Sequence, residues 1–205
     1  MLSVANLECA RGDRRLFTNL AFSLEPHTLL QVHGPNGSGK TTLLRTVCGL
    51  VLPVSGEITW QGTNIRKLKE DYLKEVFYLG HHNALKDEMN ALENLQVSTK
   101  LLGDPASEDS IIKALRRMGL KGREDLPTKL LSQGQKRRVA LARLLLTKAS
   151  LWILDEPFTA LDVAAVKLLA GVIAERIDKG GMVILTTHQE AEIATSNIRH
   201  IHLRP

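Results

Sequence analysis

Four short, largely apolar runs recur along the chain and predict buried strands. They cover residues 29–32, 76–79, 151–154 and 183–185. The chain between these runs has mostly helical spacing, so the pattern predicts a mostly parallel sheet with helices on both faces. The fold class that follows is α/β.

Two regions depart from this alternation. Residues 85–148 contain no strand-like run, and their apolar side chains fall at helical spacing, which predicts an inserted helical subdomain. The residues that carry this pattern are Leu92, Leu95, Ile111, Ile112, Leu115 and Met118. Residues 1–30 place apolar positions on both sides of Gly12 and Asp13. This arrangement predicts antiparallel strands beside the sheet, in a register that the pattern leaves open.

Composition and charge limit the classes of protein to which this chain can belong. The 205 residues are 43% apolar and 24% charged, which suffices for one packed domain and excludes a disordered chain. The net charge of +5 fits an anionic ligand, a membrane surface or a nucleic acid without distinguishing among them. Arg143 and Lys148 interrupt the longest apolar stretch, so no membrane-spanning helix is predicted. Cys9 and Cys48 form no C-x-x-C pair, which indicates a reducing compartment.

One segment matches the phosphate-binding pattern G-x-x-x-x-G-K-[ST] at every fixed position. Its residues are Gly34, Pro35, Asn36, Gly37, Ser38, Gly39, Lys40 and Thr41, followed by Thr42. Because it joins a strand to a helix, its backbone amides and the helix N-terminus face a bound phosphate. Lys40 is predicted to reach the β- and γ-phosphates, and the Thr41 hydroxyl to hold Mg²⁺. An ordinary glycine-rich turn is the weaker alternative, so the sequence predicts a nucleoside triphosphate site.

Two adjacent acids, Asp155 and Glu156, follow the strand-like run at residues 151–154. Open α/β sheets bind ligands at the carboxyl ends of their strands, so both carboxylates are expected to face the site. Asp155 is predicted to hold Mg²⁺ through water, and Glu156 to orient and deprotonate the attacking water. The alternative is a pair of solvated acids at a strand end.

The segment Ser132, Gln133, Gly134 and Gln135 opens a predicted helix. Ser132 is a good N-cap, Gly134 permits close backbone approach, and the following residues give the helix a buried face. A capped helix start with a hydroxyl and an exposed glycine is a candidate second anion site, and a plain capped helix is the alternative. This segment resembles the signature of ABC transporters.

The resemblance to the ABC family covers nearly the whole chain. Asp162 is similar to the family's D-loop aspartate, and His188 to the switch histidine that contacts the γ-phosphate. The resemblance implies a P-loop NTPase fold and an ATPase that uses ATP and Mg²⁺. It also implies one ABC domain over residues 1–205, with residues 1–84 and 146–205 as catalytic core and 85–145 as helical subdomain. Two chains are expected to pair head to tail, with ATP between the P-loop of one and the signature of the other.

Two positions depart from the family pattern. Arg11 lies where the family has an aromatic residue that stacks on adenine, and a guanidinium can take that place, with Phe17 as the alternative. His82 lies where the Q-loop glutamine is expected. A neutral imidazole can still accept a proton there, which predicts altered pH dependence, whereas a structural turn is the alternative.

Several segments resemble one subfamily, the ATP-binding subunit of the haem exporter in bacterial cytochrome c maturation. These include residues 79–81, 90–95, 137–144, 151–160 and 180–189. The resemblance implies transmembrane partner subunits and a peripheral place on the cytoplasmic face of the bacterial inner membrane. Neither nucleic acid nor direct haem binding is expected for this chain. The alternatives are the ATPase of another ABC transporter, or a non-transport ABC ATPase.

Overall fold

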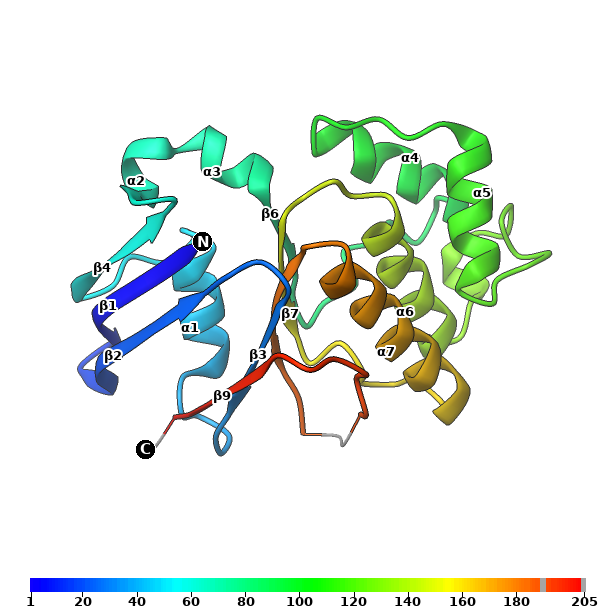
Figure 1. The fold of residues 1–205 in the computed structure, drawn as a ribbon. Helices are drawn as coiled ribbons and strands as arrows, with labels where there is room; N and C mark the ends of the chain where they lie inside the picture. Colours follow the sequence, from blue (N-terminus) through cyan, green and yellow to red (C-terminus); the bar gives the residue numbers. More distant parts are fainter. Residues whose placement is uncertain (189–190, 204–205) are drawn as a thin grey trace.

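A computed structural model describes residues 1–188 and 191–203 and is built around a five-stranded parallel sheet (Figure 1). Its strand order is β6-β7-β8-β3-β9. The bounds are Thr28–His33 for β3, Val76–Leu79 for β6, Leu151–Asp155 for β7, Met182–Thr186 for β8 and Ile198–His202 for β9. The four predicted runs are therefore confirmed as β3, β6, β7 and β8, and β9 extends the sheet at one edge.

The strands are buried on both faces, because successive side chains point to opposite sides of a sheet. In β7, Leu151 and Ile153 face one hydrophobic cluster, whereas Trp152 and Leu154 face the other. All four side chains are buried. A continuous apolar run is thus what a strand covered on both faces requires.

One face of the parallel sheet is covered by helix α1 (Lys40–Val47) and a four-stranded antiparallel sheet. The strands of this second sheet are β1 (Leu2–Arg11), β2 (Arg14–Leu24), β4 (Ser55–Trp60) and β5 (Thr63–Asn64), in the order β2-β1-β4-β5. The predicted antiparallel strands are confirmed as β1 and β2, which turn at Gly12 and Asp13. Short helices α2 (Ile65–Leu68) and α3 (Glu70–Glu75) lead from this sheet to β6.

The other face is covered by helices, as Figure 1 shows on its right-hand side. These are α4 (Ala91–Leu101), α5 (Glu108–Arg117), α6 (Gln133–Ala142) and α7 (Val163–Asp178), with 3₁₀ turns at Thr128–Leu130 and Arg143–Leu145. Residues 85–145, all of them described, contain no strand beyond one isolated bridge between Asn90 and Pro127. The predicted helical insertion is confirmed. Its apolar side chains share one continuous cluster with the sheet and α7.

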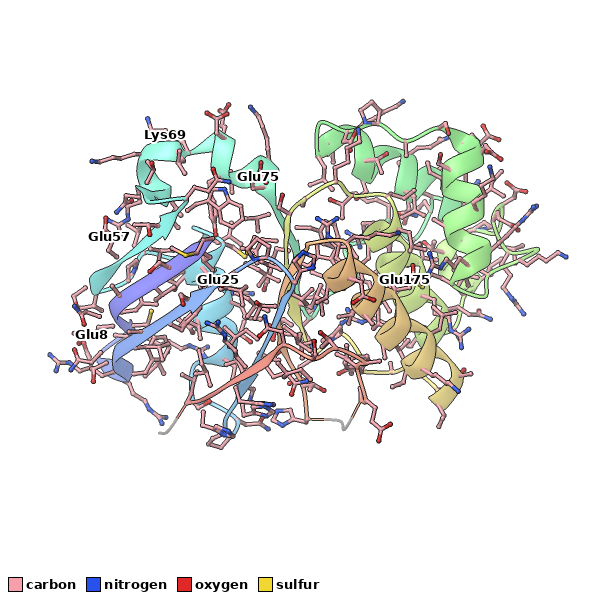
Figure 2. All side chains as sticks on the ribbon, viewed as in Figure 1. Glu8, Glu25, Glu57, Lys69, Glu75 and Glu175 are labelled. Carbon is pink, nitrogen blue, oxygen red and sulfur yellow. The ribbon has the colours of Figure 1, made fainter. Side chains whose placement is uncertain are left out.

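Polar contacts join separate elements at Glu75 and Glu175, both of which are labelled in Figure 2. Glu175 of α7 pairs with Arg117 at the end of α5, which ties α7 to the helical insertion. Glu75 at the end of α3 accepts a hydrogen bond of 2.6 Å from the Ser150 hydroxyl, directly before β7. Within the described ranges, none of the helices has the length and apolar character needed to cross a bilayer.

Candidate functional site

A cavity of about 510 Å³ lies at the carboxyl edge of the parallel sheet. The residues that line it are Arg11, Arg14, Leu16, Asn36, Gly37, Gly39, Lys40, Thr41, Thr42, His81, Asp155, Glu156, Thr159 and His188. They follow the ends of β3, β6, β7 and β8, with three further residues from the β1–β2 hairpin. Strand ends thus gather segments far apart in the chain, as expected for an open α/β sheet.

The loop between β3 and α1, together with the first turn of α1, carries most of the predicted phosphate-binding residues into this cavity. Gly39 has φ +100°, and a Cβ atom there would lie 3.0 Å from Leu16 Cβ and 3.1 Å from the Phe17 ring. A larger residue would therefore be strained and crowded. Gly34, Pro35 and Ser38 belong to the same loop without lining the cavity.

Lys40 is the first residue of helix α1, and Lys40, Thr41 and Thr42 all line the cavity. The first backbone amides of a helix have no partner within the helix. The Lys40 ammonium group donates to the carbonyl oxygens of Gly34 at 2.8 Å and of Pro35 at 3.3 Å. The lysine is mostly buried. A positive charge and a helix N-terminus therefore converge on one loop, which is an arrangement suited to phosphate.

Asp155 is 2% exposed and lies at the end of β7 between two hydroxyl groups. Thr41 Oγ1 donates to Asp155 Oδ2 at 2.8 Å, and Thr186 Oγ1 donates to Oδ1 at 2.8 Å. A threonine hydroxyl and a carboxylate are the hard oxygen donors that Mg²⁺ prefers. The residues present therefore fit the predicted metal ion.

Glu156 has a left-handed backbone, with φ +49°, directly after β7. Its N–H donates to Thr186 Oγ1 at 3.0 Å. Its side-chain Oε2 accepts the backbone N–H of His188 at 3.3 Å, and Oε1 lies 3.4 Å from His188 Nε2. Oε1 is buried and accepts no hydrogen bond within the described part of the chain. A carboxylate oxygen with free acceptor capacity beside a histidine is suited to holding a water molecule.

The turn after β6 places one histidine in the cavity. His81 lines it, whereas His82, at the expected glutamine position, does not. The two rings meet edge to face, with centroids 5.9 Å apart. Arg11 also lines the cavity together with Arg14, while Phe17 packs against the phosphate loop instead.

The signature segment forms the start of α6, and none of its residues lines the cavity. Ser132 Oγ accepts the Gln135 N–H at 3.2 Å, and Gln135 Oε1 accepts the Ser132 N–H at 2.9 Å, which completes a capping box. A Cβ atom on Gly134 would lie 3.0 Å from the Ala160 carbonyl oxygen. Asp162 caps α7 and accepts a hydrogen bond of 2.5 Å from Arg138 of α6. These contacts join the signature helix to the loop after Glu156.

Several site residues lie outside the sequence prediction: Arg14, Leu16, His81, Arg137, Thr159 and Thr186. Burial lowers the pKa of the Arg137 guanidinium, and the nearby carboxylates of Asp155 and Glu156 oppose that shift. The Lys-Arg-Arg run that contains Arg137 is typical of an exposed helix face, so no sequence signal marks it as buried. Thr186 is the last residue of a strand, and only its position beside β7 reveals its contacts.

Comparison with known proteins agrees with this geometry. The sequence profile described as "ABC transporter" matches residues 17–159. The "Cytochrome c biogenesis ATP-binding export protein CcmA" of Nitrosomonas europaea is 57% identical over 99% of this chain and 95% of its own length. A putative ABC transporter ATP-binding protein from Pyrococcus furiosus has a TM-score of 0.84 at 27% identity, over 97% of this chain and 96% of that one. The dimeric bacterial ABC transporter cassette MJ0796 has the same fold, with a TM-score of 0.84 at 21% identity, over 98% and 94%.

The parallel sheet, the phosphate loop and the adjacent acids define a P-loop nucleoside triphosphatase. The chain belongs to the ABC transporter family, within which it is an ATP-hydrolysing protein. The predicted resemblance to the cytochrome c maturation subfamily is confirmed by the relative from Nitrosomonas europaea. That relative is covered over 95% of its length and is named for cytochrome c biogenesis.

Proposed function

We propose that this chain is the ATP-hydrolysing subunit of a membrane export complex for cytochrome c biogenesis, with haem as the exported or released group. The observation that carries the proposal is the single cavity in which Lys40, Asp155, Glu156 and His188 meet. The name of the relative from Nitrosomonas europaea supports the biological setting. The assignment of haem as the transported group rests on the subfamily resemblance. The chain itself is not expected to bind haem.

The phosphate groups of ATP are bound by the loop at residues 34–41 and by the N-terminus of α1. Lys40 exchanges its contacts with loop carbonyl groups for contacts with the β- and γ-phosphates. When bound, Mg²⁺ neutralises phosphate charge, and Thr41 and Asp155 would hold it, the latter through water. Arg11 stacks on the base, because its guanidinium is planar and it lines the same cavity.

Glu156 acts as general base. One carboxylate oxygen is held by the His188 backbone N–H, so the other is free to accept a hydrogen bond from the attacking water. Proton transfer to this carboxylate accompanies attack on the γ-phosphate. The His188 imidazole, 3.4 Å from the same carboxylate, orients it and contacts the γ-phosphate.

A second copy of the chain completes the site. Ser132, Gln133, Gly134 and Gln135 do not line the cavity of their own chain, yet they form a capped helix start suited to an anion. A head-to-tail dimer brings this signature onto ATP bound by the partner. We propose further that residues 1–84 and 146–205 form the catalytic core and that residues 85–145 form the helical subdomain.

Transmembrane subunits complete the complex at the cytoplasmic face of the inner membrane. The turn that contains His81 and His82 joins β6 to the helical subdomain and reaches the ATP cavity. A partner that moves this turn therefore alters the surroundings of Glu156. His82→Ala is expected to reduce stimulation by the membrane partners more than it reduces ATP binding.

The test is made in cells from which the gene for this chain has been deleted. The native sequence should restore haem-bearing cytochrome c, whereas Lys40→Ala, expressed at the same level, should not. The tagged chain should also be recovered from membranes together with transmembrane subunits. Normal cytochrome c in the deleted cells, or full rescue by Lys40→Ala, would contradict the proposal.

A further inference from the structure

Arg137 of the signature helix is 3% exposed, and its guanidinium is surrounded by oxygen acceptors from two other segments. Nη2 donates to the Glu156 carbonyl at 2.8 Å and lies 3.5 Å from that of Asp155. Nε donates to the Pro157 carbonyl at 3.4 Å. Nη1 donates to Asn83 Oδ1 at 3.2 Å and to the Gly80 carbonyl at 3.3 Å.

These partners are neutral, although a buried arginine is usually paired with a carboxylate. Burial accordingly lowers the pKa of Arg137. Only arginine has the planar fork of five N–H donors that this set of acceptors requires. Lysine carries the same charge but has three donors on one atom, so it cannot reach both segments at once. The planar arrangement of the guanidinium donors, more than the positive charge, therefore matches the acceptors around Arg137.

The first segment is the backbone of Glu156. Its φ of +49° is unusual for a residue with a side chain, so surrounding contacts must hold it. Thr186 accepts the N–H of this residue at 3.0 Å, and Arg137 donates to its carbonyl at 2.8 Å. Both peptide groups that flank the Glu156 side chain are thereby restrained, and they set the direction of its carboxylate.

The second segment is the turn at residues 80–83, which carries His81 into the cavity. Arg137 holds its two ends, through Gly80 and Asn83. Arg143, six residues further along the chain, also donates to the Asn83 carbonyl. The turn is therefore attached to the signature helix and, through one guanidinium, to the backbone of Glu156.

We infer that Arg137 is a positioning residue, which fixes Glu156 and the turn at 80–83 relative to the signature helix. This inference rests on the proposed role of Glu156 as general base. Arg137 does not line the cavity, so it acts through Glu156 and not on ATP. Through this side chain, a displacement of the turn or of α6 reaches the carboxylate, which makes hydrolysis sensitive to the position of the helical subdomain.

The experiment compares Arg137→Lys with Arg176→Lys in the full chain. Arg176 is a matched control, because it also donates to a backbone carbonyl beside β7, that of Ala149, but at the opposite end of the strand. Arg137→Lys should lower kcat by roughly 10²-fold, as small misplacements of catalytic groups do, while KM and the Kd for ATP change less than twofold. Arg176→Lys should lower the melting temperature and leave kcat unchanged.

Three further measurements separate the outcomes. Glu156→Gln is assayed in parallel: if it retains activity, the proposed base is wrong, whereas if only Arg137→Lys retains activity, the positioning role alone is wrong. Guanidinium chloride at low concentration should partly restore kcat in Arg137→Ala. Asn83→Ala removes one contact of the fork and should lower kcat several-fold without changing the Kd for ATP. Should the Arg137 variants fail to fold, an unchanged kcat in Asn83→Ala would overturn the inference.

Discussion

Thr186 offers the sharpest test of how the two acids are held, because one buried hydroxyl serves both. The side chain is fully buried at the end of β8. Its hydroxyl donates to Asp155 Oδ1 at 2.8 Å and accepts the Glu156 N–H at 3.0 Å. Thr186→Val preserves the shape of the side chain and removes both hydrogen bonds.

The loss of stability caused by Thr186→Val follows from the two groups that lose their partner, the Asp155 carboxylate and the Glu156 N–H. Hydrogen bonds to charged groups contribute about 1.5–3 kcal/mol, and an unpaired buried N–H costs about 1–3 kcal/mol. Thr186→Val should therefore lower the free energy of unfolding by about 2.5–6 kcal/mol. Domains are stable by only about 5–15 kcal/mol, so a large part of the stability is lost. At about 2–4 °C per kcal/mol for a chain of this size, the melting temperature should fall by roughly 5–24 °C.

Equilibrium unfolding in urea measures the effect, with Thr186→Ser as the matched control. The serine keeps the hydroxyl and loses only a methyl group, so its loss of stability should be about 1 kcal/mol. The slope of the unfolding free energy against urea should be the same for both variants. If the valine variant is no less stable than the serine variant, the hydroxyl does not hold the acids as described.

Two more predictions concern titratable groups that do not line the cavity. Partial burial, with His202 and His200 nearby, lowers the pKa of His33, so the unfolded chain binds more protons and stability falls as pH drops below about 6.5. Urea unfolding at several pH values should show that His33→Gln flattens this part of the dependence; an unchanged curve would contradict it. Burial raises the pKa of the Cys9 and Cys48 thiols, so a thiol reagent at pH 8 should label neither before unfolding, and rapid labelling of the native chain would refute their placement.

Much of the architecture could be predicted because the chain repeats a simple pattern. The strand β7 carries five buried residues in succession, which a parallel sheet covered on both faces demands. The strands β4 and β5 were not predicted, because this part of the antiparallel sheet is largely exposed and shows little apolar character. Ser55, Gly56 and Glu57 are all exposed at the start of β4.

The chemistry at the cavity was predictable where one local segment carries it. The loop at residues 34–41 and the pair Asp155 and Glu156 have fixed spacing, because each binds its ligand within one stretch of backbone. Arg137 has no such spacing, since its partners Gly80 and Glu156 lie 57 and 19 positions away. Its role depends on the packing of α6 against two loops, which no local pattern specifies.

The most direct test of the central claim is a paired measurement of ATP binding and hydrolysis on the native chain and on Glu156→Gln. The account predicts that the variant binds ATP with nearly unchanged Kd and releases phosphate about 10² to 10⁴ times more slowly, because only the acceptor of the water proton is removed. Phosphate release at the native rate by Glu156→Gln, with ATP bound equally well, would contradict the assignment of this cavity as the hydrolytic site built around Glu156.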